Sequence, residues 1–185
     1  VKFFGGDLDL SSTIFNVRLN PSSPYQINFD QGKPVLCYQN KYFADTEFHP
    51  YPEFYHSKLT SGKKISQIAP VLEWGYLIYL TIFRLCQYWG RDEECQYCDI
   101  NENYRQQKKA GKEYTGVKAI EDILEALRII QEKDTVTRAI TITGGSITSN
   151  LQGKKESDFY LDYIKAISDK FGNHWIIKAV VEAYE

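Results

Sequence analysis

The sequence predicts an α/β fold with a parallel sheet, preceded by a loop- and β-rich N-terminal region. Three observations support this prediction. The apolar run at 74–85 has the composition of a strand that is covered on both faces. Two stretches with helical periodicity follow it, at 117–133 and 157–171. A short apolar strand comes after each helix, and this alternation is typical of parallel strands joined by crossovers.

Residues 1–73 form the first predicted region, which contains all six prolines of the chain. Four short strands are expected in it, at 13–19, 25–29, 35–38 and 41–44. A hairpin turn at Gln39-Asn40 joins the last two strands. Cys37 lies in this hairpin, where a role as a small buried hydrophobic residue is favoured over a ligand role.

Residues 74–185 form the second predicted region, which begins with the apolar strand. Its first helix, at 117–133, carries one apolar stripe and takes Thr115 or Gly116 as its N-cap. The polar stretch 101–114 in front of this helix is expected to be a loop. The remaining elements are a strand at 138–143, a helix at 157–171 that ends at Gly172, and a strand at 175–183.

Composition and charge argue against several classes of protein. A chain of 185 residues fits one domain, or one domain with a small annex. A net charge of −2 argues against a dedicated nucleic-acid binder. No secretory signal is evident, and the longest strongly apolar stretch, 74–83, is about half of a membrane span. We therefore expect a soluble cytoplasmic protein, whose four cysteines favour metal or redox use over disulfides.

Three of the cysteines, Cys86, Cys95 and Cys98, directly follow the apolar strand with the spacing C-x8-C-x2-C. Three thiolates on one loop can hold three irons of a cubane iron–sulfur cluster and leave the fourth iron open to a ligand. Two other interpretations remain open. A structural zinc site would need a fourth ligand, such as Cys37 or a histidine, and three unrelated buried cysteines would need no ligand at all.

In a parallel βα array, the loops that follow the strands open on the same edge of the sheet, where active sites gather. The cysteine loop follows the first strand, Gly144-Gly145-Ser146 follows the second, and Glu182 lies near the end of the third. The glycine pair is either a plain turn or a place where backbone groups are open to a ligand. These three signals therefore predict one site at this edge.

The third strand has a polar face of its own. Residues that alternate along it share one side, namely His174, Ile176, Lys178, Val180 and Glu182. Lys178 and Glu182 are expected to point inward if the strand lines a barrel. The alternative is a solvated or ion-paired edge.

The cysteine spacing and the glycine pair resemble the radical S-adenosylmethionine (radical SAM) superfamily. Its usual pattern is C-x3-C-x2-C with an aromatic residue before the last cysteine, and Tyr97 matches that aromatic. The first gap is longer here, as it is in some branches of the superfamily. Its second motif, Gly-Gly-Glu, is matched by Gly144 and Gly145, with Ser146 in the acidic position. The resemblance covers about residues 74–183.

The resemblance implies a partial (βα)6 barrel and a radical SAM enzyme. A 4Fe–4S cluster on Cys86, Cys95 and Cys98 would bind S-adenosylmethionine through its open iron. An electron from a flavodoxin- or ferredoxin-type donor would cleave this cosubstrate to methionine and a 5′-deoxyadenosyl radical. The radical would take hydrogen from a small-molecule or peptide substrate. The residues implied to contact cosubstrate or substrate are Tyr97, Gly144, Gly145, Ser146, Lys178 and Glu182.

Rival functions from other classes also remain open. A non-catalytic zinc-binding or iron–sulfur electron-transfer module would use the same cysteines without cleaving S-adenosylmethionine. A thiol redox protein would instead form a disulfide between Cys95 and Cys98. We also expect the chain to be incomplete, because it has three of the six expected parallel strands and no Met.

Overall fold

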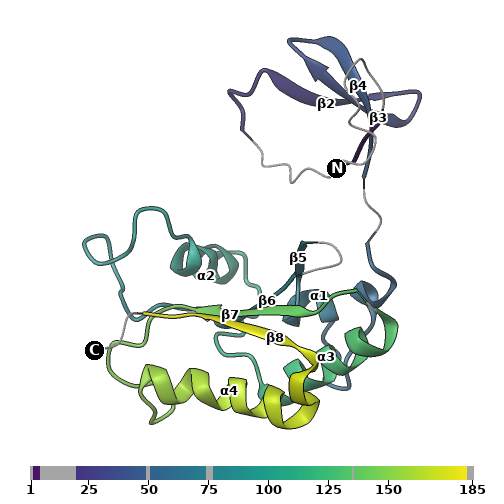
Figure 1. The fold of residues 1–185 in the computed structure, drawn as a ribbon. Coiled ribbons are helices and arrows are strands. Elements are labelled where there is room, and N and C mark those ends of the chain that lie inside the picture. The colour runs from purple at the N-terminus through teal and green to yellow at the C-terminus, as the bar shows by residue number, and fades with distance from the viewer. Residues whose placement is uncertain (1, 5–19, 49–50, 74–76, 135, 183–185) are drawn as a thin grey trace. The chain divides into compact units, whose positions relative to one another are not determined.

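The computed structural model describes residues 2–4, 20–48, 51–73, 77–134 and 136–182. The chain forms two compact units, Val1–Tyr51 and Pro52–Glu185, whose elements are drawn in Figure 1. The structure therefore divides the chain at 51/52, in front of the 73/74 boundary expected from the sequence.

The first unit contains a four-stranded antiparallel sheet with the strand order β1-β4-β3-β2. Its strands are β1 (Lys2–Phe4), β2 (Tyr25–Asp30), β3 (Lys33–Tyr38) and β4 (Lys41–Glu47). The predicted hairpin is confirmed, since Gln39 and Asn40 have positive φ angles of 49° and 63° and Tyr38 pairs with Lys41. The strand expected at 13–19 lies outside the described residues.

The second unit contains a mixed sheet with the strand order β5-β6-β7-β8. Its strands are β5 (Val71–Glu73), β6 (Leu77–Phe83), β7 (Ala139–Gly144) and β8 (Ile176–Val180). Its helices are η1 (Glu53–His56), α1 (Ile65–Ile68), α2 (Ile100–Lys109), α3 (Ile120–Lys133), α4 (Glu156–Phe171) and η2 (Gly172–His174). β6, β7 and β8 are parallel, as the sequence predicts, and β5 pairs antiparallel with β6. The α/β class is therefore confirmed.

The two faces of this sheet differ because apolar and polar residues alternate along β6 and β7. The apolar residues of both strands are fully buried in the core that α3 and α4 complete: Ile78, Leu80, Ile82, Ile140 and Ile142. Figure 1 shows α3 and α4 on one side of the sheet and α2 on the other. The residues that alternate with these apolar ones along the strand, such as Tyr79 and Thr81, line a pocket on the side of α2.

Two expectations about helices are wrong. The stretch 101–114, expected to be a loop, contains most of α2. The next helix, α3, begins at Ile120 with Ala119 as its N-cap, and neither Thr115 nor Gly116 caps it. Residues 117 and 118 pair with the end of β6 instead, since the Lys118 N–H donates to the Ile82 carbonyl at 2.9 Å.

The remaining helical boundary agrees with the prediction. α4 ends at Phe171, and Gly172 follows it with a positive φ of 56°. None of the described helices is both long enough and apolar enough to cross a membrane.

Candidate functional site

The three cysteines of the C-x8-C-x2-C motif line one small cavity of about 100 Å³ in the second unit. Its other lining residues are Tyr88, Glu94, Ile100, Asn101, Ser146 and Glu182. All three thiols are free; Cys95 and Cys98 are exposed and Cys86 is half-buried. The cavity therefore brings together residues that follow β6, β7 and β8, as the parallel strand order predicts.

Asn101, in the first turn of α2, holds the backbone of Cys86 in place. Its Oδ1 accepts a hydrogen bond from the Cys86 N–H at 2.8 Å, and its Nδ2 donates to the Tyr88 carbonyl at 2.9 Å. The side chain is only 2% exposed. Since both ends of the amide are used, α2 fixes the position of Cys86. This residue was not predicted, because a loop was expected at 101–114.

The glycine pair allows the end of β7 to lie against the backbone of residues 83–86, which lead from β6 to the first cysteine. A Cβ atom on Gly145 would lie 1.8 Å from the Leu85 carbonyl oxygen, and one on Gly144 would lie 2.4 Å from the Tyr160 hydroxyl. The Gly145 N–H also donates to the Phe83 carbonyl at 2.9 Å. The space that the missing side chains leave is therefore filled by protein atoms. These glycines first of all position Cys86, and they need not open the backbone to a ligand.

Gln87 joins the cysteine loop to the loop that follows β7. Its N–H donates to the Ser146 carbonyl and its Nε2 to the Asn150 carbonyl, both at 2.9 Å. Its Oε1 accepts from the Ser149 N–H at 3.1 Å. Through its backbone N–H and its side chain, Gln87 thus holds the Ser146 segment beside Cys86.

Glu156, buried at the start of α4, joins the loop after β7 to the end of β8. Its carboxylate accepts from the Ile147 N–H at 3.1 Å and from the Glu182 N–H at 3.3 Å. The side chain of Glu182 is thereby held at the cysteine cavity. The negative charge of Glu182 raises the pKa of the nearby Tyr88 hydroxyl.

The long first gap of the cysteine motif is a folded loop that α2 closes. The Arg105 guanidinium pairs with the Glu94 carboxylate and lies over the Trp89 ring, 4.6 Å from its centre. Glu94 also accepts from the Gly90 N–H at 2.9 Å. The hydrogen bond from Arg105 lowers the pKa of Glu94 to about 2. The extra residues between Cys86 and the other cysteines are therefore anchored.

Two other predicted site residues have different surroundings. Tyr97 is 92% exposed, and a hydrogen bond to Cys95 raises the pKa of its hydroxyl. Lys178 is exposed on β8, beside Thr141 in the strand register, and it does not line the cysteine cavity. The neighbouring Ile177 packs against the core, so Lys178 lies on the opposite face of the strand.

A single metal ion and an iron–sulfur cluster need different arrangements of their ligands. Within the described ranges, no three His, Cys, Asp or Glu side chains are placed to hold one metal ion. A cubane cluster takes one thiolate on each of several irons, so its ligands do not converge on one atom. The three free thiols line one cavity, and thiolates are the ligands that such a cluster takes.

No protein-family model, curated protein or solved structure matches this chain. The resemblance to the radical SAM superfamily therefore depends on the motif residues themselves.

Proposed function

We propose that the second unit is part of a (βα)6 barrel of a radical SAM enzyme and that Cys86, Cys95 and Cys98 hold a 4Fe–4S cluster. The observation that carries this proposal is the shared cavity. The three thiols lie in it together with Ser146 and Glu182, which come from two other strand ends. When bound, the cluster supplies the electron that splits S-adenosylmethionine into methionine and a 5′-deoxyadenosyl radical.

The protein's own residues then have distinct tasks. Asn101 and Gly145 fix the backbone of Cys86, and Gln87 keeps the Ser146 segment beside it. Glu182 supplies a carboxylate for the ammonium group of S-adenosylmethionine, which the serine at 146 does not provide. Tyr97 lies next to Cys95, where its exposed ring is open to stack on the adenine.

The test is the formation of 5′-deoxyadenosine. The protein is loaded with iron and sulfide without oxygen, reduced with dithionite and given S-adenosylmethionine, and the nucleoside is measured by chromatography. We expect product from the wild type and from Cys37→Ser, none from Cys95→Ser, and at least tenfold less from Glu182→Gln. Equal product from the wild type and Cys95→Ser would contradict the proposal, as would no product from a fully loaded protein.

A further inference from the structure

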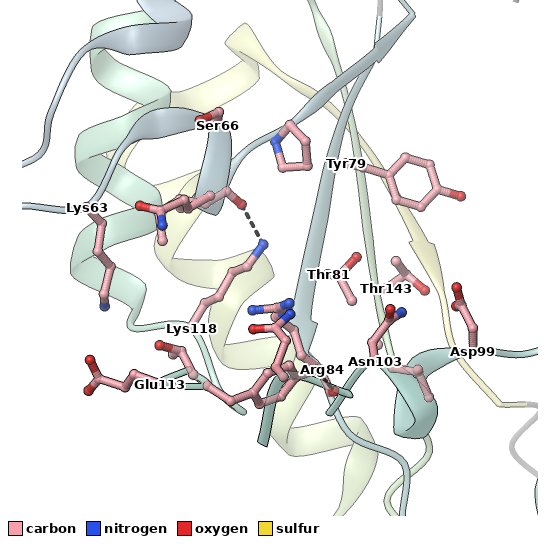
Figure 2. Close-up of a pocket in the computed structure, with 18 of the residues that line it drawn as sticks. Lys63, Ser66, Tyr79, Thr81, Arg84, Asp99, Asn103, Glu113, Lys118 and Thr143 are labelled. Atoms are coloured by element: carbon pink, nitrogen blue, oxygen red, sulfur yellow. Dashed lines mark hydrogen bonds between the residues drawn. The ribbon is translucent and has the colours of Figure 1, made fainter. Parts of the chain in front are cut away.

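A second, larger pocket of about 880 Å³ lies in the same unit, on the polar face of β6 and β7 (Figure 2). Tyr79, Thr81 and Thr143 line it from the strands, and α2 and the segment 113–118 line it from the sides. Its volume is that of a typical small-molecule site. Cys98 and Gly144 also line this pocket, so it borders the cysteine site.

Lys118 is the buried cation of this pocket, with only 4% of its surface exposed. Its Nζ donates to the Ile68 carbonyl at 2.7 Å, the contact that is dashed in Figure 2. An ammonium group has three donors, and a carbonyl oxygen does not neutralise its charge. Burial, and then the charge of Arg84, lowers the pKa of Lys118 to about 7.

Arg84 is the second cation. It directly follows the end of β6, and its guanidinium lies over the Tyr114 ring, 4.4 Å from the ring centre. In the part of the chain that the structure describes, neither Arg84 nor Lys118 takes part in an ion pair. The third cation of the pocket, Lys63, is paired with Asp122 at 2.6 Å.

The other charged groups of the pocket do not remove this imbalance. Asp99 and Glu113 line it, and both are exposed to solvent. Arg84 and Lys118, both labelled in Figure 2, are near enough that the charge of Arg84 helps to lower the pKa of Lys118. A second cation beside Arg84 is costly at a buried site, which is why the pKa of Lys118 is lowered, and an anion between the two groups would offset that cost and favour the ammonium form.

We propose that this pocket binds a small organic anion, whose carboxylate or phosphate group lies between Arg84 and Lys118. The planar guanidinium suits the oxygens of either group, and the ammonium adds a second charge-assisted hydrogen bond. The hydroxyl groups of Tyr79, Thr81 and Thr143 are then available to the rest of the molecule. As an anion site, the pocket does not depend on the proposed cluster chemistry. As the substrate site, it rests on the proposed function.

The test uses the cluster-free protein and two probes, inorganic phosphate and acetate, each titrated at constant ionic strength and followed by NMR. We expect at least one probe to bind with a single affinity, and the stronger probe identifies the anionic group. Arg84→Gln should weaken binding of that probe at least tenfold. Lys112→Gln, which removes an exposed lysine outside the pocket, should leave the affinity unchanged.

Lys118→Met keeps most of the length of the side chain, removes the charge and should likewise weaken probe binding at least tenfold. If this variant fails to fold, Arg84→Gln still decides the question, because Arg84 is only half-buried. Cys95→Ser should bind the probe like the wild type, so a failed cluster assay and a failed anion site are distinguishable. Binding of neither probe, or an equal affinity in the wild type and Arg84→Gln, would overturn the proposal.

Discussion

The two faces of β6 and β7 are built by the same strands, yet they have opposite characters. On the face toward α3 and α4, the apolar residues from Ile78 to Ile82 in β6 and from Ile140 to Ile142 in β7 are fully buried. On the other face, Tyr79, Thr81 and Thr143 line an open pocket. Neighbouring residues of one strand thus either fill the core or line the pocket.

This difference shows which positions the stability of the fold constrains and which positions it leaves open to other side chains. A residue on the helix face is surrounded by core atoms, so a smaller side chain leaves a cavity. A residue on the pocket face already borders a space, so truncating it removes few contacts. The ends of the strands, where the cysteines and glycines lie, are constrained by both requirements.

The largest expected loss of stability comes from a change on the face of the sheet that α3 and α4 cover. Ile142→Ala should lower the free energy of unfolding by about 2–5 kcal/mol, because Ile142 is fully buried between the sheet and its helices. The adjacent Thr143→Ala, on the pocket face, should cost less than about 1 kcal/mol. Urea unfolding of both variants measures the difference. Equal losses would show that the two faces do not differ as described.

The next effect concerns the strand ends. Gly145→Ala should destabilise the protein by about 1–3 kcal/mol, because its Cβ would overlap the Leu85 backbone and displace Cys86. Gly116→Ala is the matched control, since its Cβ would meet only the Leu85 side chain, at 3.3 Å. Unfolding and iron content are measured together. A Gly145→Ala protein with wild-type stability and iron content would show that this glycine does not position Cys86.

A comparable loss should follow when the clamp on Cys86 is removed. Asn101→Ala leaves the Cys86 N–H and the Tyr88 carbonyl without their partner and should cost about 1–3 kcal/mol. Asn103→Ala, an exposed asparagine of the same helix, should cost less than about 0.5 kcal/mol. Thermal unfolding gives both values. If the two variants melt together, Asn101 does not hold the cysteine loop.

The smallest effect is the acid response of the cysteine loop. The pKa of Glu94 is about 2 in the folded chain, below its ordinary value of 4.5. The stability from this carboxylate is complete above its unfolded pKa and is lost as the pH falls through the folded one. Between about pH 5 and about pH 3, the wild type should therefore lose slightly more stability than Glu94→Gln. Parallel curves for the two proteins would contradict the role of the Arg105 pair.

Local patterns predicted most of the fold. The apolar run in front of the cysteines, the short strand segment at 138–143 and the apolar stripe of α3 are readable from neighbouring residues, and the structure contains all three elements. By contrast, α2 has a mostly polar sequence, so its helical structure was not predicted. Its role in holding the cysteine loop is seen only from its contacts in the structure. The antiparallel β5 is too short to carry a period.

The same distinction applies to the candidate site. The cysteine spacing and strand order correctly predicted that the three thiols, Ser146 and Glu182 would share one edge. Asn101, Gln87 and Glu156 were not predicted, because a single polar residue has no pattern that marks its partner. Their roles arise from hydrogen bonds to the backbone of segments distant in the sequence.

We propose that the three loop cysteines, and not Cys37, hold the iron–sulfur cluster. Cys37 is buried in β3, where its sulfur accepts a hydrogen bond from the Asn28 amide at 3.4 Å. The most direct measurement is the iron and acid-labile sulfide content of the protein purified without oxygen. We predict about four irons and about four sulfides per chain in the wild type and Cys37→Ala, with both lost in Cys95→Ala and Cys98→Ala. Zinc without sulfide, or a cluster that survives Cys95→Ala but not Cys37→Ala, would contradict this ligand assignment.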